Sequence, residues 1–266
     1  MLPFRYHRAR SLDHALSLYV EGADPRYLSG GQTLIPTMKQ RLAAPSDLID
    51  IAHVPELRGV IVADGTVSIG AAVTHAEVSG SAAIVGAVPA LAMLAGQIGD
   101  PAVRARGTLG GSLANNDPAA DYPAAMLALA ATVRTSRRAI SAERFFTGLF
   151  ATALQDGEIV IGVDVPVPAK AAYRKFANPA SRYAMAGVFV AVMADGSIRV
   201  GITGAGADGV FRATAIEEAL ARSWDPSAID AVVIAPDGML ADIHGSAAYR
   251  ANLVKVMAKR AVAAAR

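Results

Sequence analysis

The chain has 266 residues, and at about 150 residues per domain this length fits one large domain or two modest ones. It contains no cysteine, which excludes disulfides, thiolate zinc sites, a catalytic cysteine and iron–sulfur clusters held by cysteines of this chain. Its 25 Lys and Arg residues against 23 Asp and Glu leave a formal charge of +2, which is too small an excess to indicate nucleic-acid binding.

The hydrophobic fraction of 53% is spread over short segments rather than collected in a membrane span. Residues 82–94 form one of the longest apolar runs, but this run is shorter than the ~20 residues of a transmembrane helix and contains Gly86 and Pro89. The basic N-terminus is followed by Asp13 and His14 instead of the apolar stretch of a signal peptide. We therefore expect a soluble cytoplasmic protein with no integral membrane segment.

The N-terminal part of the chain predicts alternating helices and strands. Apolar residues at positions 12, 15, 16 and 19 share one helix face, and Ser11 is placed to cap that helix. Further elements are expected as a strand at 27–28, a helix at 34–42, a strand at 47–51, a hairpin of 59–62 with 67–69, and a helix starting at 74–78 with Thr74 as its cap.

The central part predicts a buried helix, a long polar turn and further mixed structure. The expected elements are a helix at 82–98, a turn at 99–122, a helix at 123–131, a strand at 132–135, an amphipathic helix at 142–154 and a strand at 159–165. Two prolines at 166 and 168 interrupt this pattern. We therefore expect two domains, residues 1–168 and 169–266.

The C-terminal part predicts an antiparallel sheet covered by helices. Residues 188–194 and 197–203 flank Asp195-Gly196, a dipeptide that supplies the positive φ angles of a two-residue hairpin turn. Helices are expected at 213–222 and 246–264.

Residues 204–209 match the G-x-G-x-x-G pattern of dinucleotide-binding turns, with Asp225 and Asp230 near the distance of a ribose-binding acid. That fold places the preceding strand in a parallel βαβ unit, whereas Asp195-Gly196 predicts an antiparallel hairpin there. The pattern therefore favours an ordinary turn between sheet and helix.

Two glycine and hydroxyl segments are candidates for binding a phosphate-containing ligand. The first is Ser29-Gly30-Gly31-Gln32-Thr33, between a predicted strand and a predicted helix, and the second is Gly107-Thr108-Leu109-Gly110-Gly111-Ser112. Glycines let a backbone approach a ligand closely, and free N–H groups bind phosphate oxygens. Each segment alone fits a structural turn equally well, but two in one domain favour a cofactor that contains a diphosphate.

These segments resemble the flavin-binding subunits of the molybdenum hydroxylases, a family that includes the carbon monoxide dehydrogenase medium subunits and the flavin domain of xanthine dehydrogenase. The resemblance covers nearly the whole chain. It is carried by residues 29–36, 47–51, 69–75, 98–112, 117–121, and by 173–175 with 181–184 in the C-terminal part. It implies an α+β fold, with a two-part PCMH-like FAD-binding domain and a C-terminal antiparallel sheet with helices like that of the carbon monoxide dehydrogenase flavoproteins.

The resemblance also implies which residues bind FAD. The first segment would wrap the pyrophosphate, the second would hold its other side, Asn115 and Asp121 would face ribityl or ribose hydroxyls, and Lys175 and Tyr183 would lie near the flavin ring. The full set is Leu28, Ser29, Gly30, Gly31, Gln32, Thr33, Leu34, Thr74, Thr108, Gly110, Gly111, Ser112, Asn115, Asp121, Lys175 and Tyr183. A surface lysine and a packed tyrosine remain equally good interpretations of Lys175 and Tyr183.

The function implied by the resemblance is electron transfer in an oxidoreductase. In this family a large molybdopterin-binding subunit hydroxylates the substrate, a small 2Fe-2S subunit carries the electrons, and FAD on the medium subunit delivers them to an acceptor. The expected assembly is a dimer of heterotrimers. Two alternatives are a self-sufficient FAD-dependent oxidoreductase and a cofactor-free assembly or scaffold protein.

No metal site is expected, because His7, His14, His53, His75 and His244 are scattered without metal-ligand spacing. His75 follows Thr74 in a segment of the resemblance, so it either touches the flavin or stands beside the cap of a helix. No catalytic residue is assigned, since the redox chemistry belongs to the flavin.

Overall fold

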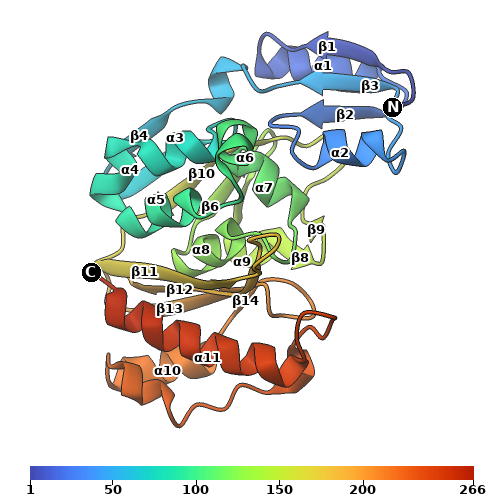
Figure 1. Cartoon of the computed structure of the whole chain (residues 1–266). Coiled ribbons are helices and arrows are strands. Elements are labelled where there is room, and N and C mark those ends of the chain that lie inside the picture. The colour runs from blue at the N-terminus through green and yellow to red at the C-terminus, as the bar shows by residue number, and fades with distance from the viewer.

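A computed structural model describes all 266 residues of the chain. It has an N-terminal unit, a central unit and a C-terminal layer, which follow one another from top to bottom in Figure 1. Helices and antiparallel sheets dominate the central and C-terminal parts, so the predicted α+β class is confirmed.

The N-terminal unit is a three-stranded parallel sheet in the order β1-β3-β2. Its elements are β1 (Arg5–Arg8), α1 (Leu12–Glu21), β2 (Pro25–Leu28), α2 (Leu34–Lys39) and β3 (Asp47–Asp50). Ser11 caps α1 as predicted, since its side chain accepts a hydrogen bond from the His14 N–H. Parallel strands need crossover connections, and the two short helices supply them.

Asp47 ties the edge strand β1 to the central strand β3. Its buried carboxylate accepts hydrogen bonds from Arg5 at 2.9 Å, Ser46 at 2.6 Å and His7 Nε2 at 2.7 Å. These partners, Arg5 foremost, hold the pKa of Asp47 well below its ordinary value.

A carboxyl group whose pKa is lower in the folded than in the unfolded chain stabilises the fold above its ordinary pKa, and this contribution is lost as the pH falls below that value. We therefore expect Asp47→Asn to flatten the acid side of the stability profile, measured as the urea midpoint from about pH 6 to about pH 3. An unchanged acid loss in the variant would show that other carboxylates cause it.

The central unit is built on a five-stranded antiparallel sheet in the order β4-β5-β10-β6-β7. The strands are β4 (Val60–Ala63), β5 (Thr66–Gly70), β6 (Thr132–Thr135), β7 (Ala139–Ser141) and β10 (Val160–Pro166). A short 3-10 helix, η1 (Pro55–Leu57), precedes the sheet. The helices are α3 (His75–Gly80), α4 (Ala82–Ala87), α5 (Pro89–Gly96), α6 (Pro101–Arg106), α7 (Leu109–Asn115), α8 (Tyr122–Ala128) and α9 (Ala142–Phe145).

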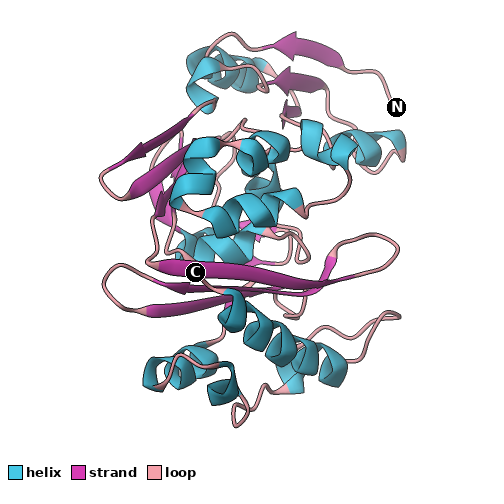
Figure 2. Cartoon of the chain, turned by 60° about the vertical axis from the view of Figure 1, so that its left-hand side comes forward, coloured by secondary structure: helices cyan, strands magenta, loops and turns pink.

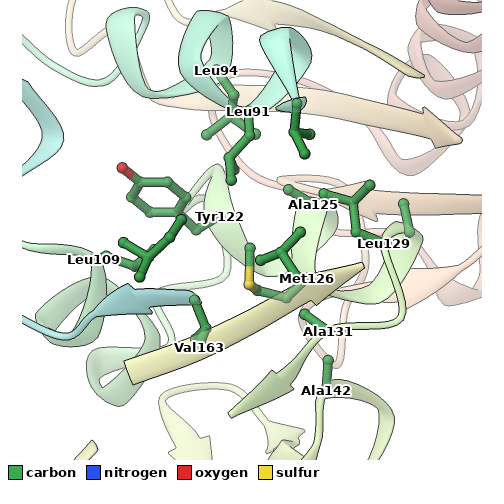
Figure 3. Packing of buried hydrophobic residues seen from close by; sticks show 14 of the residues in the cluster. Leu91, Leu94, Leu109, Tyr122, Ala125, Met126, Leu129, Ala131, Ala142 and Val163 are labelled. Carbon is green, nitrogen blue, oxygen red and sulfur yellow. The ribbon is translucent and has the colours of Figure 1, made fainter. Parts of the chain in front are cut away.

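Helix α8 lies at the centre of the molecule and is buried along its whole length. Its residues, among them Tyr122, Ala125 and Met126, pack with Leu91 and Leu94 of α5 and Val163 of β10 (Figure 3). A helix that is apolar on all sides has no solvent-facing side, so α8 must be enclosed. It contacts strands of the C-terminal sheet as well and thereby joins the two parts.

The predicted helix at 82–98 is wrong as a single element, because the chain breaks at Val88 into α4 and α5. Val88 has φ −139° and ψ 70°, outside the helical region. Pro89 causes the break, since its ring disfavours helical geometry in the preceding residue and it lacks an N–H.

The predicted helix at 142–154 is also wrong beyond its first turn. After α9 the chain forms a small hairpin of β8 (Phe146–Gly148) and β9 (Ala151–Thr152). The buried Asn116 side chain donates to the carbonyls of Gly148 and Ala151, both at 2.8 Å. These carbonyls would accept hydrogen bonds from N–H groups of the same segment in a helix, but here they accept them from Asn116.

The predicted turn at 99–122 contains two short helices, α6 and α7. Asp100 caps α6 and Thr108 caps α7 through their side chains. Consequently the second glycine segment is a loop at 107–108 followed by the first turn of a helix, and not a loop throughout.

The C-terminal layer is a four-stranded antiparallel sheet in the order β11-β12-β13-β14. Its elements are β11 (Lys170–Ala177), β12 (Ala184–Val192), β13 (Ile198–Thr203), β14 (Phe211–Arg212), α10 (Thr214–Arg222), η2 (Pro226–Ile229), η3 (Pro236–Gly238) and α11 (Ala247–Ala264). One sheet face packs on α5 and α8 and the other on α10 and α11, an arrangement also seen in Figure 2. We keep residue 168 as the proposed domain boundary, in the connection from β10 to β11.

The hairpin predicted around Asp195-Gly196 is confirmed as the antiparallel pair β12 and β13. Residues 204–209 form the connection from β13 to β14, which are also antiparallel. The G-x-G-x-x-G pattern is therefore an ordinary turn, as predicted, because no parallel βαβ unit surrounds it.

Candidate functional site

A cleft of about 850 Å³ opens where the N-terminal unit meets the central unit. Its walls come from residues 26–34 and 107–115, with 180–183 contributed by the C-terminal part. This volume lies within the range of about 300–1,000 Å³ that ligand sites occupy.

The two glycine segments pack directly against each other at this cleft. The hydroxyls of Ser29 and Thr108 are hydrogen-bonded at 2.9 Å. A Cβ atom on Gly30 would collide with the backbone of Arg106 and Gly107. Only glycine at position 30 therefore permits this approach, and the two segments act as one structure.

The backbone of the first segment presents unused donors to the cleft. None of the N–H groups of residues 30–33 donates to a protein acceptor, and Gly31 has φ +72°, a conformation that favours glycine. Consecutive free N–H groups form an anion-binding concavity, which suits the oxygens of a diphosphate.

The second segment is shaped by the start of α7. Thr108 accepts a hydrogen bond from the Gly111 N–H at 3.2 Å and so caps the helix. Gly110 packs on Ala71, where a Cβ would lie 2.5 Å from the alanine Cβ. Gly111, in contrast, is exposed and lines the cleft.

The structure brings most of the predicted FAD-binding residues together in the lining of this cleft. The members are Leu28, Ser29, Gly30, Gly31, Gln32, Thr33, Leu34, Thr108, Gly110, Gly111, Ser112, Asn115, Asp121 and Tyr183. Thr74 and Lys175 do not line it. Thr74 caps α3 in a capping box with Glu77, and Lys175 lies behind Asp121.

Asp121, Tyr173 and Lys175 form a buried cluster between the central unit and the C-terminal sheet. The Tyr173 hydroxyl donates to one Asp121 oxygen at 2.5 Å, and Lys175 Nζ lies 3.1 Å from the carboxylate. Lys175 also donates to the Gln97 carbonyl at 2.9 Å. Burial raises the pKa of Asp121 above its ordinary value, while Lys175 and Tyr173 oppose that rise. Both side chains that donate hydrogen bonds to Asp121, those of Tyr173 and Lys175, therefore belong to this buried cluster.

His75 lies in the cleft wall with its side chain almost fully buried and its Nδ1 without any hydrogen-bond partner. Its ring packs 5.4 Å from that of Tyr122, whose hydroxyl is also buried and unpaired. Burial, reinforced by the charge of Arg104, lowers the pKa of His75 to about 4. The imidazole is therefore neutral at neutral pH.

We expect the NMR signals of the His75 ring to stay constant from about pH 8 to about pH 5 and to shift only near pH 4. A depressed pKa means that the neutral ring stabilises the fold above the unfolded value of 6.5, and that this contribution is lost as the pH falls through about 4. His75→Asn identifies the signals. A midpoint near 6.5 would show that the ring is solvated.

Several lining residues were not selected from the sequence. Glu158 and Ile159 directly precede β10, Val160 begins it, and none of the three carries a binding signal of its own in the sequence. Arg182 and Ser181 also line the cleft, and their place directly before Tyr183 could have indicated them. Val103 of α6 also lines the cleft, and the spacing of apolar residues in that segment does not predict this.

No cluster of three or more His, Asp or Glu side chains has the arrangement of a metal site. None of the helices combines the length and hydropathy that crossing a bilayer requires.

The fold and cleft define a class of protein with two packed glycine segments whose free N–H groups suit a cofactor that contains a diphosphate. Residues 2–168 match the family described as the FAD binding domain in molybdopterin dehydrogenase. The chain belongs to this family, which confirms the resemblance drawn from its motifs. FAD is its cofactor, and the free N–H groups of residues 30–33 fit that molecule's diphosphate.

Known relatives match the chain over nearly its whole length. The carbon monoxide dehydrogenase medium chain of Hydrogenophaga pseudoflava is 34% identical, with 100% of this chain and 98% of that one covered. The nicotine 6-hydroxylase medium subunit of Paenarthrobacter nicotinovorans is 35% identical, with coverages of 97% and 95%. A chain of the reconstituted CO dehydrogenase from Oligotropha carboxidovorans superposes with a TM-score of 0.90 at 33% identity, covering 99% and 98%. The chain is accordingly an oxidoreductase component.

Proposed function

We propose that this chain is the FAD-carrying medium subunit of a molybdenum hydroxylase and passes electrons from iron–sulfur clusters on a partner chain to an external acceptor. The observation that carries the proposal is the cleft between the packed glycine segments, in a chain whose full-length relatives are medium subunits. FAD supplies the redox chemistry when bound.

The chain's own residues bind and orient the cofactor. We assign the pyrophosphate to the free N–H groups of residues 30–33 on one side and to Gly111 and Ser112 on the other. Asn115 and Asp121 are assigned to ribityl or ribose hydroxyls. Tyr183, half exposed at the rim, is assigned to the flavin ring, and Lys175 acts on that end of the site through Asp121.

The absence of cysteine supports the need for partners. Iron–sulfur clusters are held by thiolates, so any such cluster in the electron path must lie on another chain. We infer a large molybdopterin-binding subunit and a small 2Fe-2S subunit, in line with the names of the medium-chain relatives. A dimer of such heterotrimers in the cytoplasm stays a prediction.

The test starts from protein purified from its native host. Flavin absorption with co-purifying molybdenum, iron and two further chains is expected. The full chain is then loaded with oxidised FAD and mixed without oxygen with partner subunits whose clusters have been reduced with limiting dithionite. Flavin bleaching that coincides with recovery of the iron–sulfur absorption supports the relay. If the chain purifies alone and turns over a substrate of its own, the electron-relay proposal is wrong and the protein is a self-sufficient oxidoreductase. If the chain is colourless and does not bind added FAD, the remaining interpretation is a scaffold protein.

A further inference from the structure

A second pocket of about 470 Å³ lies beside the cleft and shares Gly99 and Arg182 with it. Its lining includes three cationic side chains, Arg104, Lys175 and Arg182, and no acidic residue. Neither glycine segment contributes to its walls. The pocket is therefore distinct from the part of the cleft assigned to the cofactor's diphosphate.

Asn178 supplies a buried donor to this pocket. The residue is only 8% exposed, and its Oδ1 accepts hydrogen bonds from the N–H groups of Ala180 at 2.9 Å and Ser181 at 3.2 Å. These two bonds settle which amide atom is the oxygen. The Nδ2 group has no protein acceptor, and it is not sealed from solvent. The Nδ2 group is thus free to donate to a ligand in the pocket that Asn178 lines.

Two of the cations around Asn178 are held in place by hydrogen bonds, and Arg104 retains free donors. Lys175 is fixed by the Gln97 carbonyl and by Asp121. Arg104 Nη1 donates to the carbonyls of Ile98 at 3.0 Å and Gly99 at 3.3 Å, which leaves Nε and Nη2 free. Donors fixed in this way bind an anion without a large ordering cost.

Arg182 completes the group from the same loop as Asn178. Its side chain makes no hydrogen bond or ion pair with the protein, and its backbone is held at φ +63°. Two internal hydrogen bonds close the turn, from the Arg182 N–H to the Asn178 carbonyl at 2.8 Å and from the Asn178 N–H to the Tyr183 carbonyl at 2.8 Å. The turn therefore carries Asn178 and Arg182 as a pair.

We propose that this pocket binds the oxyanion of a small molecule, a phosphate or a carboxylate, directly beside the flavin cleft. Guanidinium and amide donors together match oxyanion oxygens, and no acidic side chain lines the pocket, while the Lys175 ammonium is already paired with Asp121 behind it. The proposal goes beyond the electron relay, because it concerns a second ligand and not the cofactor.

The experiment titrates the FAD-loaded full chain with inorganic phosphate, followed by calorimetry and phosphorus NMR. Saturable binding of one phosphate per chain is expected. Arg182→Gln should weaken it about five-fold, since a charge-assisted hydrogen bond is lost. Arg174→Gln is the matched control: it removes the same charge beside Lys175, from a residue that does not line the pocket, and should change the affinity less than about two-fold.

Parallel titrations with acetate and with ADP distinguish the sources of the oxyanion. Tighter binding of ADP than of phosphate supports a phosphate carried by a larger molecule, and acetate binding sensitive to Arg182→Gln supports a carboxylate. The proposal is overturned if no saturable binding occurs or if Arg174→Gln weakens binding as much as Arg182→Gln. A chain that fails to load FAD would contradict the proposed function, while its phosphate titration would still decide the pocket.

Discussion

Gly111→Asp is expected to lower the affinity for FAD by at least about 100-fold, with the fold retained. Gly111 is exposed on the cleft wall, and an added Cβ would meet only the Thr108 hydroxyl, at 2.9 Å. At the proposed position of the diphosphate the new carboxylate would face it, and two like charges 4 Å apart repel by about 4 kcal/mol at an effective dielectric constant of about 20. Each 1.4 kcal/mol is about ten-fold in affinity, so a repulsion of about 4 kcal/mol corresponds to more than the expected loss of about 100-fold. Flavin absorbance retained after gel filtration and fluorescence titration measure the loss.

The matched variant is Gly111→Asn, which adds nearly the same volume without charge. It should weaken FAD binding far less than Gly111→Asp, while circular dichroism and the melting temperature of the two variants stay close. Equal losses in both variants would mean that volume and not charge excludes the cofactor. Unchanged FAD binding in both variants would show that the diphosphate does not lie at the start of α7.

Lys175→Met is expected to destabilise the chain by about 3 kcal/mol, the largest stability effect at the site. The lysine ammonium lies 3.1 Å from Asp121, and both side chains are buried between the central unit and the C-terminal sheet. Without Lys175 the carboxylate remains buried and unpaired, and its pKa, already raised by burial, rises further. The stability cost of its ionisation then grows as the pH rises, so the variant loses most stability at neutral and alkaline pH and least in acid.

A double-mutant cycle separates the ion pair from simple loss of packing. Asp121→Asn combined with Lys175→Met leaves no buried charge, so the double variant should be more stable than Lys175→Met alone at neutral pH. Lys39→Met, at an exposed position with no side-chain hydrogen bond, should change stability by less than about 0.5 kcal/mol. Additive losses in the cycle would contradict a coupled pair. Urea unfolding at several pH values supplies all the measurements.

Much of the candidate site was accessible from the sequence, because its binding features are local. Gly30 and Gly111 stand in short segments whose glycine and hydroxyl pattern already indicates a phosphate ligand. That pattern does not show that the two segments touch. The hydrogen bond between Ser29 and Thr108 joins residues 79 positions apart, a distance over which periodicity and turn rules have no information.

The helix boundaries that were predicted wrongly also depend on contacts between residues that are distant in the sequence. Residues 142–145 begin as predicted, but Asn116 takes the carbonyls of Gly148 and Ala151 and turns the following segment into a hairpin. Likewise, spacing shows that α8 is apolar, while only the packed structure shows that it is enclosed between two sheets. Tertiary partners override local preference wherever they satisfy the backbone better.

The sequence by itself determined the α+β class, the caps at Ser11 and Thr74, the hairpin at Asp195-Gly196 and the exclusion of any cysteine-held cluster. Capping and turn geometry depend on residues a few positions apart, so they can be predicted from the sequence. The tertiary structure alone decided that Lys175 pairs with Asp121 and that Asn178, Arg104 and Arg182 meet in one pocket. Arg104, Asp121 and the segment 175–182 belong to separate parts of the fold, and only the packing of the sheets and helices brings them within reach of one another.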